Sequence, residues 1–506
     1  MGHQIELDAE IAVVGYGPVG KTLSVLLAQQ GHSVVVADRR TSPYPLPRAV
    51  HFDHEVARIF QSCGIGAELA QITEPADIYE WRNGQGITLL RLGRIGAGTS
   101  GWPESLMFHQ PALEELLDRR ARDLGVEVRR GLEVTGIAQD DDCLTLHADN
   151  GQVVRARYAI GCDGANTTVG RLAGLPTHDL GFSYDWLIAD VVLRQPRVFD
   201  PVNVQVCDPA RPTTIVSGGP GRRRWEFMRL EHETLDELNS ETRAWELLEH
   251  WDVRPDNATL ERHAVYTFNA RHAERWRTGR VLLAGDAAHQ MPPFAGQGMC
   301  SGIRDAANLA WKIGLVLTDR APDELLGTYE QERRPSACQA IEFSVELGKI
   351  ICMADPEEAA KRDEAMSAFV GPEPTAAPAL PGVEIGIIEP GSPHAGTLFI
   401  QGIVGGQLFD DVHGTGWRLI TIDGDPGAIT PETSRWFASI GGRIVTVPGD
   451  DPVYGRWFTE HNATSALQRP DFYLYGTAAD PVGAAALLDH LRARLSVPAI
   501  SEGTRP

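Results

Sequence analysis

Residues 280–312, RVLLAGDAAHQMPPFAGQGMCSGIRDAANLAWK, decide the fold of this chain. The apolar run Val281 to Ala284 predicts a buried strand, which ends in the sharp turn Gly285-Asp286. After Gly296-Gln297-Gly298 the pattern becomes helical, from about Ile303 to Leu317. Glycines directly before a helix let a flat ligand approach the backbone, and a helix N-terminus favours negative charge on that ligand. The stretch therefore predicts a strand–turn–helix unit whose Asp286 carboxylate accepts hydrogen bonds from a polyol chain; an ordinary acidic helix cap is the alternative.

A second ligand-binding pattern lies near the N-terminus. The apolar run Ile11 to Val14 is followed by Gly15-Tyr16-Gly17-Pro18-Val19-Gly20 and by a helical pattern from Lys21 to Gln30. In GxGxxG between a strand and a helix, the first glycine makes the turn, the second admits a pyrophosphate, and the third lets the helix pack closely. A second strand, Ser33 to Ala37, ends at Asp38, where such folds bind a ribose hydroxyl. These residues predict a dinucleotide site.

Nearby charges have two readings. Lys21, Arg39 and Arg40 are in reach of a phosphate group, but solvated surface charge is the ordinary role of such residues. Arg39 is kept as a candidate for cofactor binding.

Two further segments fit the same site. Tyr158 to Ile160 predicts a short strand, followed by Gly161-Cys162-Asp163-Gly164 and the start of a helix near Arg171. Upstream, Phe108-His109-Gln110-Pro111 leads into a helix, with Pro111 in its first turn. Gln110 then lies at a helix N-terminus, where its side chain is predicted to bond a nucleotide.

Composition bounds the functional class. A chain of 506 residues indicates roughly two to four domains. Its net charge of -22 argues against nucleic acid as a partner, because a phosphate backbone needs a basic patch. No uninterrupted apolar stretch is long enough to span a bilayer and the N-terminus lacks the pattern of a secretory signal, so we expect no membrane association. The seven cysteines are scattered without a CxxC pair, which favours a reducing cytoplasm. No metal-ligand spacing is present, so no metal is expected.

The motifs together resemble a known family, the class A flavoprotein aromatic hydroxylases, which are single-component FAD monooxygenases of the para-hydroxybenzoate hydroxylase fold. The resemblance rests on Gly15 to Gly20, on Cys162-Asp163-Gly164 and on Gly285-Asp286 with the loop after it, in that order, over roughly the first 350 residues. Arg48, in Pro47-Arg48-Ala49, also matches a family position near the flavin.

The resemblance implies a noncovalent FAD, NADH or NADPH as a transient electron donor and O2 as co-substrate, with oxygen transferred from a flavin C4a-hydroperoxide to a phenolic ring. It places Arg48, Pro293 and Gly296 in the environment of the flavin ring. The cofactor-binding residues that it implies are Gly15, Gly17, Pro18, Val19, Gly20, Asp38, Arg39, Arg48, Gln110, Asp163, Gly164, Gly285, Asp286, Pro293, Gly296, Gly298 and Met299.

Within the family, the chain is most similar to members like 3-(3-hydroxyphenyl)propionate hydroxylase. The similar segments are Val206 to Pro212, Arg223 to Met228 and Val265 to Arg271. They make Arg211 a candidate carboxylate anchor, with an exposed turn arginine as the alternative, and Tyr266 a second candidate for substrate contact. His51-Phe52 and Pro293-Phe294-Ala295 depart from the family pattern in the ring region and put the exact substrate in doubt.

The predicted architecture is α/β with an added α+β part. A Rossmann-like FAD-binding domain is expected from residues 1–75, 105–180 and 275–380, and a β-sheet substrate domain from 76–104 and 181–274. Strands are predicted at Trp186 to Val192, Asn203 to Val206, Thr213 to Ser217, Trp225 to Leu230 and Ala264 to Phe268.

The C-terminal third is expected to form a separate domain. A charged helix, Met353 to Ser367, and a linker rich in proline and alanine, Gly371 to Gly382, precede it. Residues 381–506 resemble the thioredoxin-like C-terminal domain of some class A hydroxylases, with strands at Thr397 to Ile400, Trp417 to Ile422, Arg443 to Val447 and Phe472 to Tyr475, and a last helix from about Pro481 to Leu495. No cysteine follows Cys352, so a structural or homodimer-related role is expected there.

Other functions remain open. A hydroxylase of a polycyclic aromatic polyketide or a drug shares the fold but takes a larger substrate. A flavin-dependent halogenase is disfavoured because its WxWxIP motif is absent, and a flavoprotein without hydroxylase activity is disfavoured because all the motifs are intact.

Overall fold

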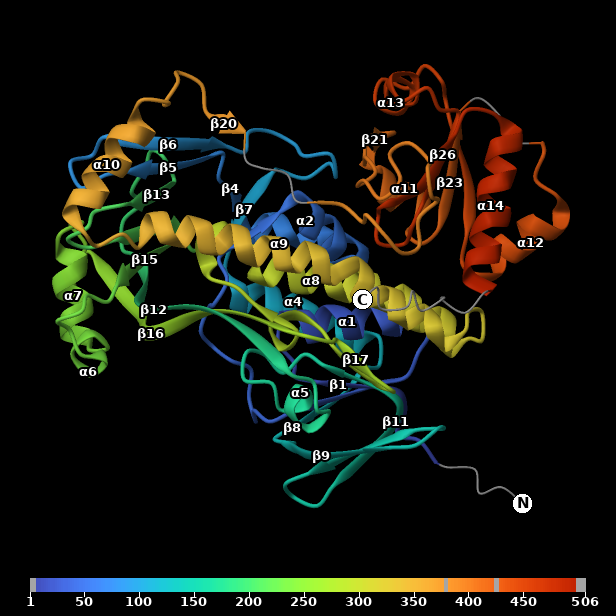
Figure 1. The fold of residues 1–506 in the computed structure, drawn as a ribbon, viewed down its shortest axis with the longest axis horizontal. Coiled ribbons are helices and arrows are strands. Elements are labelled where there is room, and N and C mark those ends of the chain that lie inside the picture. Colours follow the sequence, from blue (N-terminus) through green and yellow to red (C-terminus); the bar gives the residue numbers. More distant parts are fainter. Residues whose placement is uncertain (1–5, 377–380, 423–426, 497–506) are drawn as a thin grey trace, which may run out of the picture.

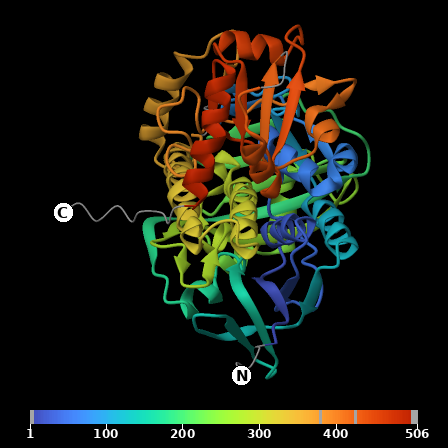
Figure 2. The same ribbon diagram turned by 90° about the vertical axis from the view of Figure 1, so that its right-hand side faces the viewer.

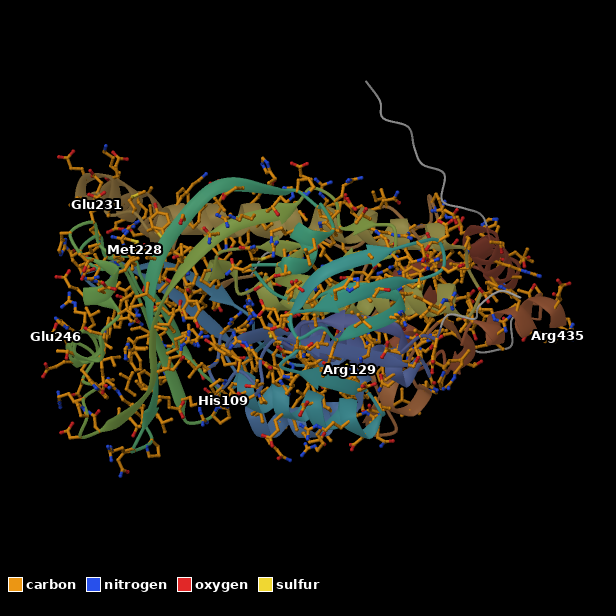
Figure 3. All side chains as sticks on the ribbon, turned by 90° about the horizontal axis from the view of Figure 1, so that it is seen from below. His109, Arg129, Met228, Glu231, Glu246 and Arg435 are labelled. Carbon is orange, nitrogen blue, oxygen red and sulfur yellow. The ribbon has the colours of Figure 1, made fainter. Side chains whose placement is uncertain are left out.

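The computed structural model describes residues 6–376, 381–422 and 427–496. A parallel sheet with its helices occupies the middle of the molecule, a long antiparallel sheet lies at one end, and a C-terminal unit at the other (Figures 1 and 2). Figure 3 shows the same arrangement from below, with Glu231 and Glu246 on the outer end of the antiparallel sheet and Arg435 at the opposite tip. None of the helices in these ranges is long and apolar enough to cross a membrane.

The central sheet contains the four strands that the motifs predict. Strands β1 (Ala9–Val14), β2 (Val34–Asp38), β11 (Val153–Gly161) and β18 (Val281–Leu283) run parallel to one another. They are largely buried because helices and loops cover both faces of a parallel sheet. The whole sheet has the order β17-β18-β11-β1-β2-β8, with β10 and β9 beside β11; the other strands are β8 (Glu127–Arg130), β9 (Val134–Gln139), β10 (Leu144–Ala148) and β17 (Arg277–Thr278).

Four helices pack around this sheet: α1 (Pro18–Gln29), α4 (Gln110–Asp123), α8 (Gly298–Leu317) and α9 (Gly327–Ile351). Helix α8 begins earlier than the predicted Ile303. Its first five residues include Gly298 and Gly302, and glycine is a poor helix former, so the sequence pattern did not indicate this part of the helix. Gly302 is needed there because a Cβ would stand 2.6 Å from Cγ2 of Val19.

The antiparallel sheet has nine strands in the order β19-β16-β12-β15-β14-β13-β5-β6-β20. All five predicted strands of the substrate region belong to it. Two of them are much longer than predicted because they pair with each other along most of their length, polar ends included. The strands are β5 (Ile78–Arg82), β6 (Thr88–Gly93), β12 (Thr177–Leu193), β13 (Asn203–Val206), β14 (Thr213–Ser217), β15 (Arg222–Met228), β16 (Ala258–Ala273), β19 (His289–Gln290) and β20 (Thr375–Ala376).

The predicted linker contributes to this sheet. Thr375 pairs with Leu92 of β6, so part of Gly371 to Gly382 is an edge strand, while residues 377–380 lie outside the described ranges. The charged helix before it is confirmed as α10 (Pro356–Ser367). The remaining elements of this part are α2 (His54–Phe60), α3 (Gly66–Ile72), α5 (Thr168–Leu172), α6 (Leu235–Leu238), α7 (Glu241–Glu249) and a small sheet of β3 (His51–Asp53), β7 (Ser105–Phe108) and β4 (Thr73–Pro75).

The C-terminal unit has a four-stranded sheet in the order β24-β23-β25-β26. Strands β23 and β24 are parallel, and β25 and β26 are antiparallel additions. In chain order the elements are β23 (Arg418–Ile422), α12 (Pro431–Ser439), β24 (Arg443–Val447), α13 (Tyr454–Glu460), β25 (Ser465–Gln468), β26 (Leu474–Ala478) and α14 (Pro481–Ser496).

Two strand predictions for this unit were inaccurate. Thr397 to Ile400 is not a strand; only Leu398 forms a bridge, with Tyr473. The last strand begins at Leu474 rather than at Phe472, because Phe472 has a φ of 71° and belongs to the preceding turn. The segment before β23 adds the hairpin β21 (Ile403–Val404) and β22 (Gln407–Leu408) and the helix α11 (Phe409–His413).

Buried ion pairs fasten the C-terminal unit to the rest of the protein. Arg58 of α2 donates from Nε to Asp410 Oδ2 at 2.6 Å. Glu332 of α9 lies 2.5 Å from Nη2 of Arg469 and 2.8 Å from Nζ of Lys312, all fully buried. Such pairs need both partners, because one partner left alone in the interior is an uncompensated charge. The unit is therefore fixed in one orientation.

Candidate active site

A cavity of about 570 Å³ lies between the carboxyl ends of the central strands and one face of the nine-stranded sheet. It is lined by predicted site residues from segments far apart in the sequence: Gly15, Gly17, Pro18, Val19, Asp38, Arg39, Arg48, Gln110, Asp163, Gly164, Asp286, Pro293, Gly296, Gly298 and Met299. Gly20 and Gly285 lie behind this surface, in the turns that shape it. The carboxyl edge of such a sheet is where open α/β folds bind ligands.

The three glycines of the first turn have different surroundings. A Cβ on Gly15 would come within 2.5 Å of the Cys162 carbonyl oxygen, and a Cβ on Gly20 within 2.1 Å of the Gly15 carbonyl oxygen. Around Gly17 a Cβ would meet nothing within 4 Å. Gly15 and Gly20 are thus required by the protein itself, whereas the space at Gly17 is free for a ligand.

The acidic and basic residues near this turn are partly engaged. Asp38 ends β2 and accepts a hydrogen bond from the Arg40 backbone N–H at 2.9 Å. Lys21 is not a solvated charge, as the sequence led us to expect: it is 1% exposed and ion-paired with Glu114. The helical periodicity of α1 turns it toward α4, so its ion-pair partner is a carboxylate distant in sequence.

The Gly285-Asp286 turn is held from beneath. Asp305 of α8 accepts hydrogen bonds from the Gly285 backbone N–H at 3.0 Å and from Arg333 Nε at 2.9 Å, and lies 2.6 Å from Nε2 of His289. Among the described residues none donates a hydrogen bond to the Asp286 side chain, which lines the cavity. Burial raises the pKa of Asp286, and His289 and Arg48 partly offset that shift. An acceptor without a donor, facing a cavity, fits a ligand with hydroxyl groups.

Asp163 and Gln110 use their side chains on the protein. Asp163 Oδ2 accepts from the backbone N–H groups of Thr168 and Val169 at 2.6 and 3.0 Å. Gln110 Oε1 accepts from the backbone N–H groups of Arg48 and Ala49 at 2.8 and 2.7 Å. Both residues border the cavity, but these contacts shape the loops rather than leave polar atoms free.

The Arg48 loop is also held from the sheet. Arg224 of β15 donates from Nη1 to the Arg48 carbonyl at 2.6 Å and from Nη2 to the Pro47 carbonyl at 2.9 Å. Its Nε donates to Asp190 Oδ1 at 2.6 Å. The Arg48 guanidinium itself lies 4.9 Å from the centre of the Tyr44 ring. Its backbone is thus fixed while its side chain faces the cavity.

The structure does not bring the two predicted substrate residues to this cavity. Arg211 forms a two-point ion pair with Glu233, with both nitrogen–oxygen distances at 2.7 Å. The ring of Tyr266 packs under Arg262, and its hydroxyl lies 2.9 Å from that of Tyr44, which does line the cavity. Arg211 is therefore corrected from a carboxylate anchor to a structural residue.

One sheet face closes the far side of the cavity. Tyr79, Trp81 and Phe268 supply aromatic surface there, and Thr214 and Glu226 supply polar atoms. His51 lies at the edge: its Nε2 is 3.1 Å from Arg94 Nη1, and burial together with Arg94 lowers its pKa to about 4, so the ring is neutral.

Sequence patterns alone missed Asp305, Arg224 and Glu226. Asp305 lies in a helix that is mostly apolar, and a charged residue in such a helix is a signal for a buried partner. Glu226 and Arg224 alternate along one face of a strand, a pattern that indicates a polar face in contact with a ligand.

The cavity suits a flavin dinucleotide: an open glycine position for a pyrophosphate, a free carboxylate for a polyol, and the first backbone amides of α8 near Gly298 and Met299, which have no partner within the helix. Residues 8–344 match the family model described as FAD binding domain. The chain is 40% identical over 96% of its length to the "Probable NADH-specific resorcinol 4-hydroxylase" of Rhodococcus jostii (strain RHA1), covering 95% of that protein.

The chain belongs to the class A flavoprotein aromatic hydroxylases.

Other relatives agree with this family. The hydroxylase is 34% identical, over 92% of its length and 88% of the relative's, to the 3-(3-hydroxy-phenyl)propionate/3-hydroxycinnamic acid hydroxylase of Mycolicibacterium gilvum (strain PYR-GCK). Among solved structures it has the fold of the flavin-dependent monooxygenase PieE (TM-score 0.80, 20% identity, 97% of this chain and 100% of that chain). It also has the fold of aklavinone-11 hydroxylase (TM-score 0.78, 22% identity, 97% and 99%). The protein is thus an FAD-dependent monooxygenase.

Proposed function

We propose that this hydroxylase oxygenates a small monocyclic phenol of the resorcinol type, with NADH as electron donor. The observation that carries the proposal is the cavity, which continues from the dinucleotide turns to a wall of aromatic and hydroxyl side chains. An aromatic-lined chamber with a few polar atoms suits one phenolic ring. The relative at 40% identity, whose name specifies NADH and resorcinol, supports both choices.

A second candidate is a phenol with a short acidic side chain, such as 3-(3-hydroxyphenyl)propionate. Arg94 lines the cavity, and no carboxylate within the described ranges lies in ion-pair distance of it. Its guanidinium is a candidate partner for a substrate carboxylate, because two parallel hydrogen bonds fit that pairing. Arg94 replaces Arg211 as the predicted anchor. A multi-ring substrate stays an outcome of the test.

The residues that would hold FAD follow from the geometry. Gly15, Gly17 and Gly164 would border the pyrophosphate, Asp38 would bind the ribose and Asp286 the ribityl chain, while Gly298 and Met299 would offer helix amides to the ring. FAD, when bound, accepts a hydride from NADH and activates O2. Arg48, Pro293 and Gly296 would border the ring and, together with Phe294, keep water from it. Gln110 positions the Arg48 loop.

The C-terminal unit supports a finer assignment. We infer that residues 381–506 form a thioredoxin-like domain, because its βαβαββα order and its pair of parallel strands followed by two antiparallel strands agree with that fold. The domain limits set by the sequence, 1–75, 105–180 and 275–380 against 76–104 and 181–274, are kept as a proposal, as are a homodimer-related role for the C-terminal domain and a cytoplasmic location.

Anaerobic stopped-flow absorbance tests the function. We expect resorcinol to accelerate reduction of the bound FAD by NADH, and we expect a hydroxylated product by mass spectrometry once oxygen is admitted. Acceleration by 3-(3-hydroxyphenyl)propionate alone, lost in Arg94→Met, would favour the second candidate. Acceleration by multi-ring phenols alone would replace both, and no response to any phenol would contradict the proposed function.

A further inference from the structure

The sheet wall of the cavity contains a carboxylate without a hydrogen-bond partner. Glu226 of β15 lies opposite Thr214 of β14, lines the cavity and is 7% exposed. Within the described ranges no group donates a hydrogen bond to its oxygens. The nearest ion-pair partner, Arg224 Nη1, is 3.7 Å away and already donates to the Arg48 carbonyl. The lone pairs of Glu226 are therefore free for a ligand in the cavity.

The hydroxyl groups beside Glu226 donate their hydrogen bonds to other protein groups. Thr214 Oγ1 and the Tyr79 hydroxyl both donate to Gln205 Oε1, at 2.7 and 3.2 Å, and Gln205 Nε2 donates to the Thr213 carbonyl at 3.1 Å. The hydroxyl hydrogens of this part of the wall are therefore engaged, and Glu226 offers a free acceptor beside them. It fits a ligand that donates, such as a hydroxyl group, and disfavours a ligand carboxylate at the same place.

The charges around Glu226 tune its basicity. Burial raises the pKa of its carboxyl; Arg224 on the same strand and Arg262 on β16 oppose the shift, and Asp190 on β12 adds to it. From β5, Tyr79 faces the same space, and its own pKa is raised by burial and by the Cys207 and Glu226 charges. A carboxylate with a raised pKa is a better proton acceptor near neutral pH.

We propose that Glu226 is the catalytic proton acceptor for the phenolic hydroxyl of the substrate. This inference rests on the proposed function. The hydroxyl donates to a Glu226 oxygen in the bound state. As the ring carbon ortho to it bonds to the incoming oxygen atom derived from O2, the O–O bond of that atom breaks and its electron pair goes to the departing oxygen. At the same time the O–H bond of the substrate breaks: its electron pair moves through the phenolic oxygen into the ring, and its proton moves to the carboxylate. The ortho ring carbon then loses its hydrogen as a proton and the phenolic oxygen regains one, which restores the aromatic ring. On product release the proton passes to solvent.

The test compares wild type with Glu226→Gln, which keeps the shape and removes the base. The matched control is Glu261→Gln, which removes an exposed carboxylate of the same sheet. FAD content and thermal unfolding show that each variant is folded. With resorcinol, we expect the hydroxylation step of Glu226→Gln to slow about a hundredfold, so that more NADH is consumed per product. In wild type and the control we expect the product yield to fall toward acid pH. In Glu226→Gln we expect the yield not to change with pH in that range.

A binding measurement gives a readout independent of turnover. The visible band of bound 4-nitrophenol reports the pKa of a phenol in the cavity of the oxidised holoenzyme. A neighbouring carboxylate disfavours the phenolate, so we expect this pKa to be lower by about one unit in Glu226→Gln than in wild type and the control. If Glu226→Gln does not fold, Glu226→Asp replaces it and should retain the acid limb with a slower hydroxylation step.

The outcomes separate the two levels of inference. An unchanged yield and pH profile in Glu226→Gln, or equal 4-nitrophenol pKa values, would overturn the role of Glu226 while leaving the hydroxylase intact. Absence of any hydroxylated product from wild type and Glu261→Gln alike would overturn the proposed function instead.

Discussion

The buried carboxylate of Asp305 accepts a hydrogen bond from the backbone N–H of Gly285 at 3.0 Å. This contact joins the middle of helix α8 to the turn that presents Asp286 to the cavity. The same carboxylate pairs with Arg333 and His289, so one side chain fixes the turn, the helix and α9 together.

Replacing Asp305 should destabilise this junction. We expect Asp305→Asn to lower the free energy of unfolding by about 3–5 kcal/mol, because Arg333 loses its buried counter-charge. Urea unfolding of the apoprotein measures the effect. Asp319→Asn, exposed just past the end of α8, is the control and should stay within about 0.5 kcal/mol of wild type. Equal midpoints for Asp305→Asn and wild type would contradict the structural role.

Substitution of two glycines of the first turn should have different effects, one on FAD affinity and the other on the stability of the apoprotein. Gly17 has a φ of -83°, open to any residue, and free space at its Cβ, so Gly17→Val should leave the apoprotein's unfolding midpoint unchanged. Its side chain would fill the pyrophosphate space, and FAD affinity should fall at least tenfold, about 1.4 kcal/mol. Gly20→Ala clashes with the Gly15 carbonyl and should destabilise the apoprotein by about 1–3 kcal/mol. Full FAD occupancy in Gly17→Val would refute the assignment of this turn.

Asp286 should make FAD binding depend on pH. Burial holds its pKa above the ordinary value, and ribityl hydroxyls donate stronger hydrogen bonds to the ionised form than to the neutral carboxyl. A proton therefore competes with FAD, and affinity should fall as pH decreases through that pKa and level off above it. Fluorescence titrations of FAD at several pH values measure this.

Variants isolate the contribution of that carboxylate. Asp286→Asn should remove the pH dependence due to this group, and Asp286→Ala should weaken binding at neutral pH by about 1.5–3 kcal/mol, roughly tenfold to a hundredfold. The same slope in Asp286→Asn and wild type would assign the effect to another group.

Glu332 should stabilise the attachment of the C-terminal unit in a way that acid removes. Burial alone would raise its pKa, but Arg469 and Lys312 hold it at about 2. Since this folded value lies below the ordinary 4.5, the stabilisation is fully present above about pH 4.5 and is lost as pH falls toward 2.

Glu332→Gln should therefore cost about 3–5 kcal/mol at neutral pH and flatten the acid dependence of unfolding. Glu346→Gln, on an exposed pair of the same helix, should cost less than about 1 kcal/mol. Similar losses in the two variants, measured by urea unfolding, would show that the buried network contributes no more than a surface pair.

Local chemistry explains what could be predicted. Glycine turns lie within a few residues of the strand ends at Val14, Gly161 and Leu283. Glycine is needed in these turns because other backbone or a ligand comes close to them. The order of the motifs along the chain then predicts the fold of the first two thirds of the protein, which the relatives confirm.

Contacts between distant segments explain the rest. No residue adjacent to Arg211 in the sequence indicates that Glu233 will pair with two of its guanidinium nitrogens. The sequence therefore could not distinguish an arginine that binds a substrate carboxylate from one in a structural ion pair. The full length of β12 likewise depends on its pairing with β16, not on its own alternation of apolar residues. Glu226 follows three arginines in its strand, so the sequence suggests an ion pair until the structure places Thr214 and the cavity beside it.

Tyr473 of the C-terminal unit donates its hydroxyl to Glu55 Oε1 at 2.7 Å. Glu55 is paired with Arg304, which also pairs with Asp53 and donates to Gln297 at the cavity. Tyr473 follows all three nucleotide motifs in the sequence, so it is synthesised after them. A nascent chain that already carries all three nucleotide motifs still has Glu55 without this partner. The surroundings of Glu55 and Arg304 are therefore completed only after the C-terminal unit is made, although Tyr473 belongs to none of the nucleotide motifs.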